Sequence, residues 1–246
     1  MTRHRGVFLL GALIGLIWAA GPAAAQDISI SLGDDVSLSG RAIQLIALIT
    51  VLSLAPGLAI MITCFPFMVT VLAILRQGIG LQQSPPNMLI VSLALFLTYF
   101  VMEPVFMAAW EEGIGPLTRE ELPVELAIER ALEPFRHFMA GRVDSDTFAS
   151  MAALRPGGEA LRPDPDAPLS VLVPSFLLSE ISRAFQIGFL IFLPFLIIDL
   201  VVAAILMSMG MMMVPPVIVS LPFKLAFFVI ADGWRLIADS LVRGYF

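Results

Sequence analysis

The sequence is poor in charge and in the residue types on which most enzymes depend. Only 14% of its 246 residues are charged, whereas ordinary soluble domains carry about 25%. Cys64 is the single cysteine, which excludes an intramolecular disulfide framework and a cysteine-rich metal site. The two histidines, His4 and His137, lie far apart in the chain, and the sequence has no HExxH motif and no apolar segment that carries a Ser–His pair. We therefore expect a protein that is not an enzyme and that needs no metal and no cofactor.

Apolar side chains are what the sequence has in abundance. Its residues are 59% hydrophobic and its mean hydropathy is +0.93, which is typical of an integral membrane protein. The net charge of −6 argues against nucleic acid as a partner, because nucleic-acid-binding proteins need basic patches. The composition predicts an all-α membrane protein, and the prolines within its apolar segments predict broken helical hairpins.

The first 40 residues predict a leader and a short external segment. Residues 1–25 have the form of a cleavable signal peptide, with a positive start, an apolar core over residues 7–20 and three alanines at residues 23–25 as the cleavage site. The alternative is an uncleaved first membrane helix, which the short apolar core disfavours. Residues 26–40 would then be a short periplasmic N-terminus.

Residues 41–110 predict the first apolar helical hairpin. The interval between Arg41 and Arg76 has no charge and, as one helix, would be about 50 Å long, so we expect Pro56 and Pro66 to break or kink it. A Gly/Pro loop over residues 76–86 precedes a second apolar segment over residues 87–102, with Pro104 at its far end. Two crossings return the chain to its starting side, which places residues 111–174 in the periplasm.

Residues 111–174 form the one long polar stretch, and we expect them to be a small helical periplasmic domain. Apolar residues recur in it at helical spacing and predict an amphipathic helix that carries Phe135 and Phe138. These two rings pack either within the domain or against a second copy, and the small core of so short a domain favours self-association. Residues 155–168 are rich in proline and glycine and are expected to be a mobile linker.

Residues 175–246 predict a second apolar hairpin, which Pro194, Pro215, Pro216 and Pro222 would fragment. We expect Ser175 to cap its first helix, which should end near Val214 before the proline pair. A methionine-rich tip joins the two arms and contains Met209, Met211, Met212 and Met213. Methionine is flexible and adapts to irregular neighbours, so this cluster is either ordinary apolar packing or a compliant collar.

Two pairs of opposite charges lie in this second hairpin. Asp199 and Lys224 are equally distant from the tip, so they would lie at one depth and pair, because an unpaired ion in apolar surroundings costs several kcal/mol. Glu180 and Arg183 are three residues apart and would pair on one helix face, either as an exposed pair of little energetic value or as a pair that supports assembly. Broken helices survive in a membrane only when protein covers them or they line a cavity, so we expect one subunit of a larger assembly.

Long segments of the chain resemble a known family. The segment over residues 183–225 reads RAFQIGFLIFLPFLIIDLVVAAILMSMGMMMVPPVIVSLPFKL, and residues 63–104 read TCFPFMVTVLAILRQGIGLQQSPPNMLIVSLALFLTYFVMEP. Together with FFVIADGWRLIADSL at residues 227–241 and GGEALRPD at residues 157–164, they closely resemble the FliP/SctR family of type III secretion export gates. The leader, the proline pair and the sizeable polar domain favour the flagellar branch over the virulence injectisome branch.

The resemblance implies a structural role in protein export. Family members build the entry pore for unfolded flagellar axial proteins in the bacterial inner membrane, at the flagellar basal body, as a helical assembly of FliP copies with FliQ and FliR. FlhB, FlhA and the assembly factor FliO are further partners that the family implies. The family's methionine-rich gasket around the closed pore corresponds to Met209, Met211, Met212 and Met213, and its charged positions to Glu180, Asp199 and Lys224. A solute transporter with Asp199 as its ion site and a membrane-anchored assembly factor remain alternatives.

Overall fold

The computed structural model describes residues 38–81, 84–211 and 213–246. The predicted signal peptide, nearly all of the predicted periplasmic N-terminus and Met212 lie outside the described residues. The chain divides into two compact units, Met1–Val51 and Leu52–Phe246. Helix α2 (Leu38–Met61) crosses this boundary, and its part in the first unit contains a hydrogen bond of 2.8 Å from Thr50 Oγ1 to the carbonyl of Ile46.

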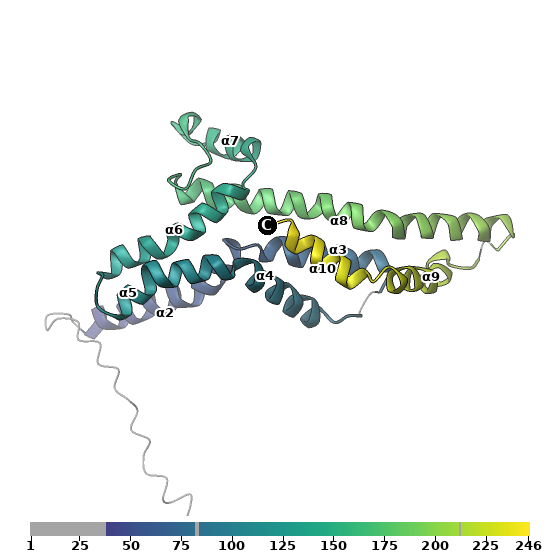
Figure 1. Ribbon diagram of the computed structural model, residues 1–246, viewed down its shortest axis with the longest axis horizontal. Helices are drawn as coiled ribbons and strands as arrows, with labels where there is room; N and C mark the ends of the chain where they lie inside the picture. Colours follow the sequence, from purple (N-terminus) through teal and green to yellow (C-terminus); the bar gives the residue numbers. More distant parts are fainter. Residues whose placement is uncertain (1–37, 82–83, 212) are drawn as a thin grey trace, which may run out of the picture. The chain divides into compact units, whose positions relative to one another are not determined.

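Helices are the regular secondary structure of the second unit among the residues that the structure describes, which confirms the all-α prediction at that level. The polar region of the chain contributes α5 and α6 beside a π-helical turn, η1, and α7 beside a 3₁₀ turn, η2 (Figure 1). In chain order the elements are α3 (Phe65–Ile79), α4 (Asn87–Ala109), η1 (Trp110–Ile114), α5 (Gly115–Thr118), α6 (Val124–Arg142), α7 (Ser145–Ala153), η2 (Gly158–Ala160), α8 (Leu169–Ser208), α9 (Pro216–Ile230) and α10 (Gly233–Arg243).

Helix α3 is the centre of the second unit. Its buried side chains recur every three or four residues, so they form one face that packs against α8. Gly188 of α8 allows the close approach, because a Cβ there would lie 2.4 Å from Ile74 Cδ1 of α3. Helices α4 and α9 also contact α3, and α9 returns alongside α8 before it leads into α10 (Figure 1). The core on this face contains Phe67, Met68, Val71, Leu72, Leu75 and Ile79.

The polar stretch is packed onto the apolar helices rather than onto itself alone. Helix α6 contacts α4 and α8, and α7 contacts the first turns of α8, where a second core forms around Phe148, Leu172 and Phe176. The segment expected to be a mobile linker contains η2 and two anchored carbonyls, because Arg136 donates 3.0 Å hydrogen bonds to Pro165 O and Ala167 O. The polar stretch therefore has a firm attachment to α8.

Prolines interrupt the helices less than the sequence suggested. Pro56, Pro104, Pro174, Pro194 and Pro222 all lie inside helices, so the prediction of a heavily fragmented second hairpin is wrong. A proline removes one backbone donor, and a helix continues past it where neighbouring helices or side chains satisfy the freed carbonyl. The expected break near Pro66 does occur, because α2 ends at Met61 and Pro66 lies in the first turn of α3.

Two helix boundaries also differ from the prediction. Helix α8 begins at Leu169, so Ser175 does not cap it but lies buried inside it, and the structure gives its Oγ no hydrogen-bond partner among the described residues. The same helix ends at Ser208 rather than near Val214, because Gly210 adopts a left-handed conformation with φ of 73°. Glycine is the residue that adopts this conformation without a steric penalty, and it ends the helix before the proline pair can.

Within the described part of the chain, two helical stretches are long and apolar enough to cross a membrane, Asn87–Thr118 and Leu169–Ser208. A third is possible if α9 and α10, which meet at a bend of 61°, count as one broken span. At about 1.5 Å per residue, the 40 residues of α8 extend about 60 Å, twice the ~30 Å thickness of a hydrocarbon core. A single bilayer therefore cannot cover the whole of α8.

Candidate functional site

The apolar hairpin of α8 and α9 contains a charge pair. Lys224 Nζ of α9 lies 2.5 Å from Asp199 Oδ2 of α8 and donates a second hydrogen bond of 3.1 Å to the carbonyl of Gly78 in α3. Ser220, one turn before the lysine, donates a hydrogen bond of 2.5 Å to Asp199 Oδ1. The structure thus brings together Asp199 and Lys224, which are 25 residues apart in the sequence. Sequence reasoning did not identify Ser220 or the Gly78 carbonyl, whose roles depend on tertiary contacts.

This arrangement joins α3, α8 and α9. Lys224 is only 3% exposed, and its ammonium is neutralised by a carboxylate from one helix and satisfied by a carbonyl from another. A buried ion requires partners of this kind, since the desolvation penalty is otherwise several kcal/mol. The pair therefore fixes α9 against α8 and α3 near the end of the hairpin.

The methionine cluster lies where the hairpin turns. The backbone N–H of Met211 donates to the carbonyl of Leu206 over 2.9 Å, and Gly210 in its left-handed conformation starts the turn toward α9. Met213 is 97% exposed, and Met207, Met209 and Met211 also point large parts of their side chains out of the chain. The tip thus presents several flexible apolar side chains that nothing in the described chain covers.

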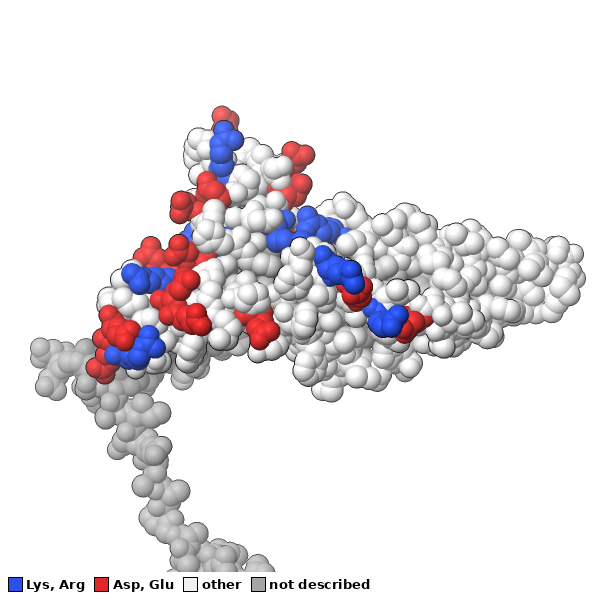
Figure 2. Space-filling view, viewed as in Figure 1, with Lys and Arg blue, Asp and Glu red and all other residues white. Residues whose placement is uncertain are grey.

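Charge is distributed unevenly over the second unit. Acidic and basic side chains gather over α5, α6 and α7, whereas the far half of the α8–α9 hairpin presents apolar side chains (Figure 2). Large exposed apolar residues continue along this half of α8, among them Phe185, Phe189, Leu190, Ile197, Leu200 and Ile205. Membrane lipid or other subunits must cover so extensive an apolar surface.

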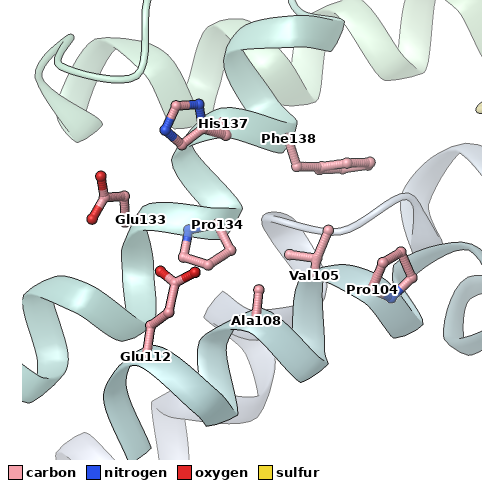
Figure 3. Close-up of a pocket in the computed structure, with 8 residues that line it drawn as sticks. All are labelled: Pro104, Val105, Ala108, Glu112, Glu133, Pro134, His137 and Phe138. Atoms are coloured by element: carbon pink, nitrogen blue, oxygen red, sulfur yellow. The ribbon is translucent and has the colours of Figure 1, made fainter.

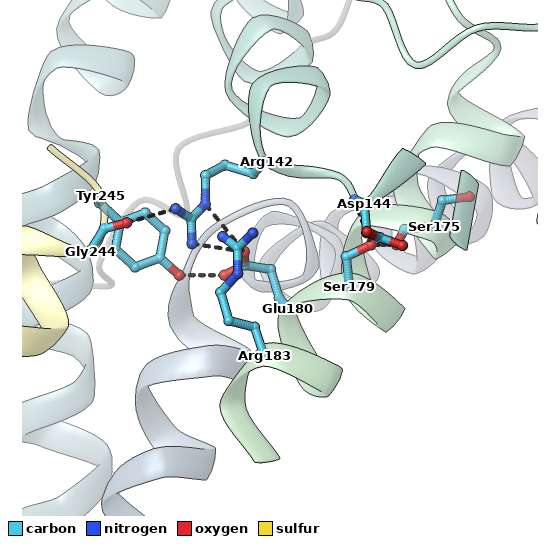
Figure 4. Close-up of polar contacts among 8 residues, drawn as sticks. All are labelled: Arg142, Asp144, Ser175, Ser179, Glu180, Arg183, Gly244 and Tyr245. Carbon is cyan, nitrogen blue, oxygen red and sulfur yellow. Dashed lines mark hydrogen bonds and ion pairs between the residues drawn. The ribbon is translucent and has the colours of Figure 1, made fainter. Parts of the chain in front are cut away.

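A second ionic cluster is centred on Glu180 of α8, which is fully buried (Figure 4). Arg142 at the end of α6 donates from Nη2 over 3.2 Å and from Nε over 3.3 Å to Glu180 Oε1, and Tyr245 donates its hydroxyl to Oε2. Arg183 lies farther away, at 3.9 Å. The predicted pairing of Glu180 with Arg183 is therefore present as the weakest contact of the cluster, but its expected exposure is wrong, because α6 and the segment after α10 cover the carboxylate. Sequence spacing gave no signal for Arg142 or Tyr245, which lie 38 and 65 residues from Glu180.

Helix α7 is attached beside this cluster. Asp144 caps α7 by accepting a 2.9 Å hydrogen bond from the backbone N–H of Thr147, and the backbone N–H of Asp144 donates to Ser179 Oγ of α8 over 3.0 Å (Figure 4). The Thr147 backbone N–H and hydroxyl hold the pKa of the Asp144 carboxyl below its usual range.

Phe135 and Phe138 of α6 have aromatic partners within the chain. The Phe135 ring lies 5.8 Å from the ring of Phe106, and the Phe138 ring lies 5.7 Å from Phe176 and 6.2 Å from Tyr245. The premise for assigning them to self-association was that the polar stretch has too little core of its own. Self-association does not follow from that premise, because helices outside the polar stretch supply partners for both rings. Self-association through these rings stays an untested prediction.

A cavity of about 480 Å³ lies between α4 and α6 (Figure 3). Pro104, Val105, Ala108, Pro134 and Phe138 form its apolar wall, and Glu112, Glu133 and His137 also line it. Among the described residues, no three His, Cys, Asp or Glu side chains are grouped so that they could hold a metal ion. The structure therefore gives no geometric basis for metal chemistry in this cavity.

Comparison with known proteins extends over nearly the whole chain. A model described as the FliP family matches residues 48–241. The flagellar biosynthetic protein FliP of Caulobacter vibrioides is 48% identical over 245 residues, which cover 100% of this chain and 92% of that protein. The proteins of the same name from Rhizobium meliloti and Bacillus subtilis are 47% and 44% identical and cover 95% and 89% of this chain, and 97% and 98% of their own lengths.

Proposed function

This chain belongs to the FliP family, and we propose on that basis that it is a core subunit of the pore through which the flagellar type III export gate passes unfolded axial proteins. The relatives with which it shares 41–49% identity are named flagellar biosynthetic proteins, which supports the flagellar branch rather than the injectisome branch. Its place would be the bacterial inner membrane at the flagellar basal body. Its partners would be further copies of itself, FliQ and FliR.

The methionine tip of the α8–α9 hairpin is the observation that carries the proposed mechanism. In a ring of copies, Met209, Met211, Met212 and Met213 would form a compliant collar that closes the pore to ions and yields to a passing chain. Unbranched thioether side chains adapt their shape at low energetic cost, which suits a seal around an irregular opening. The left-handed Gly210 and the Asp199–Lys224 pair would hold this collar at a fixed position on each subunit.

The length and surface of α8 support an assembly over a solitary membrane protein. A helix of about 60 Å extends well beyond a ~30 Å bilayer core, and its apolar side chains are exposed along much of that length. Lipid covers only the part inside the membrane, so neighbouring subunits would have to cover the remainder. A small-solute transporter working alone would leave this surface in water.

The test is an ion-leak measurement on the assembled complex. Replacing Met209, Met211 and Met213 with alanine, together with Met212, should raise the leak of small ions while the complex still assembles. The matched control replaces Met88 and Met107, two exposed methionines of α4, with alanine. Equal leak in the tip variant and the control, in complexes of unchanged mass, would rule out the collar. Purification of the chain only as a monomer would rule out the assembly itself.

A further inference from the structure

The buried carboxylate of Glu180 is completed by the segment that follows α10. Tyr245 reaches Glu180 with its hydroxyl, and Arg142 Nη1 donates a 2.7 Å hydrogen bond to the carbonyl of Gly244 (Figure 4). Arg142 therefore contacts both the carboxylate of α8 and the backbone after α10. Together, Arg142 and Glu180 form a polar surface that residues 244–245 contact.

The ring of Tyr245 packs against this surface, in addition to the hydrogen bond that its hydroxyl donates. It lies beneath the guanidinium of Arg142, whose Cζ is 3.9 Å from the ring centroid, a cation–π contact. Phe138 of α6 stacks on the ring at 6.2 Å, and Phe67 of α3 meets it edge-on at 5.6 Å. One side chain therefore touches α3, α6 and α8 at once. By contrast Phe246, the next residue, is 79% exposed.

We propose that residues 244–245 are a latch, with Tyr245 as its anchor, that fastens the return arm of the hairpin to the polar region. The return arm of α9, α10 and residues 244–245 then has two polar attachments to α8, the ion pair of Lys224 with Asp199 and, closer to the start of α8, the hydrogen bond of Tyr245 to Glu180. The first attachment holds the tip, and the second joins α10 to α6. Opening the latch leaves Glu180 with Arg142 and the more distant Arg183, and it frees α6 and α10 from each other. This role of Tyr245 does not depend on whether the chain forms a pore.

Hydrogen exchange of the full chain tests the latch directly. In the Tyr245→Ala variant, amides of α10 and of the last turn of α6 should exchange at least about tenfold faster, because a lost buried hydrogen bond and ring contact free both elements together. Amides of α9 around Lys224 should keep their protection. Phe246→Ala is the matched control, since it removes an equally large aromatic side chain that is exposed.

The outcome separates a latch from ordinary surface packing. Exchange in α10 that rises no more in Tyr245→Ala than in Phe246→Ala would overturn the proposal. So would faster exchange in α10 with unchanged exchange at the end of α6. If Tyr245→Ala fails to accumulate, Tyr245→Phe keeps the ring and removes only the bond to Glu180, and the same two elements should then lose protection by a smaller factor. Unchanged protection in Tyr245→Phe would show that the hydroxyl of Tyr245 does not contribute to the latch.

Discussion

Lys224 and Asp199 form an asymmetric pair. The lysine side chain is 4% exposed and has the Asp199 carboxylate and one carbonyl as its partners, whereas the aspartate side chain is 34% exposed and also accepts from Ser220. Loss of the aspartate would therefore leave an ammonium buried with a single carbonyl. Loss of the lysine would leave a carboxylate that keeps a hydroxyl and has an open side.

We expect Asp199→Asn to destabilise the chain by about 3 kcal/mol, because it leaves a buried lysine without its counter-ion. Lys224→Met should cost less, and the double variant should be more stable than Asp199→Asn alone, since it removes both charges. Unfolding titrations of the purified chain in mixed micelles would measure this cycle. The exposed pair Asp239–Arg243 of α10 provides the control cycle, in which we expect almost no coupling. Additive effects in the Asp199–Lys224 cycle would contradict the pairing.

Gly210 should be the least replaceable residue of the methionine tip. Its φ of 73° is a left-handed conformation in which a Cβ costs about 1–2 kcal/mol, so Gly210→Ala should destabilise the chain and shift the tip. Gly141 in α6 is the matched control, because an added Cβ there meets no atom within 4 Å. Gly141→Ala should stabilise the chain by about 0.5–1 kcal/mol through helix propensity. Thermal unfolding of both variants would show opposite signs, and two shifts of equal sign would contradict this account.

The contact of α3 with α8 can be tested by a paired substitution. Gly188→Ala places a Cβ 2.4 Å from Ile74 Cδ1, so it should destabilise the chain by about 1–3 kcal/mol through overpacking. Ile74→Val removes that terminal carbon and should restore most of the lost stability in the double variant. Unfolding titrations would give the four free energies of the cycle. A double variant as unstable as the sum of the singles would show that the two helices do not meet at this point.

Sequence patterns predicted the parts of the fold that depend on local chemistry. Helical spacing located the amphipathic α6, and the spacing of Asp199 and Lys224 from a common tip anticipated their proximity. Both signals work because a helix repeats every 3.6 residues and an ion in an apolar segment needs a counter-ion. The prolines did not predict where helices end, since Pro174 and Pro194 lie inside α8, a helix of 40 residues that continues past both.

The side-chain partners that sequence reasoning missed depend on contacts between segments that are distant in the sequence. Glu180 was expected to pair with Arg183, and it does so at 3.9 Å, but its closer partners Arg142 and Tyr245 come from α6 and from beyond α10. The residue spacing within one helix gives no information about contacts with segments far away in the sequence. The burial of Phe138 against Tyr245 has the same origin, because the core that covers it comes from other helices.

Alkaline pH should open the contact between Tyr245 and Glu180. Burial, together with the nearby carboxylate, raises the pKa of Tyr245 above its ordinary value of 10.0. A group whose folded pKa is raised stabilises the fold fully below its unfolded pKa and loses that contribution as the pH rises. The free energy of unfolding should therefore fall by up to about 1.4 kcal/mol per pH unit above pH 10.

The two tyrosines of the chain make this alkaline dependence assignable to one residue. Tyr245→Phe removes the titrating hydroxyl, so its unfolding free energy should fall less steeply above pH 10 than that of the unmodified chain. Tyr99→Phe alters the exposed tyrosine of α4 and should keep the full slope. Unfolding titrations at several pH values between 8 and 11.5 would measure all three chains under the same conditions. Parallel curves for Tyr245→Phe and the unmodified chain would mean that the hydroxyl of Tyr245 titrates no differently in the folded and the unfolded chain, and its burial against Glu180 would then be wrong.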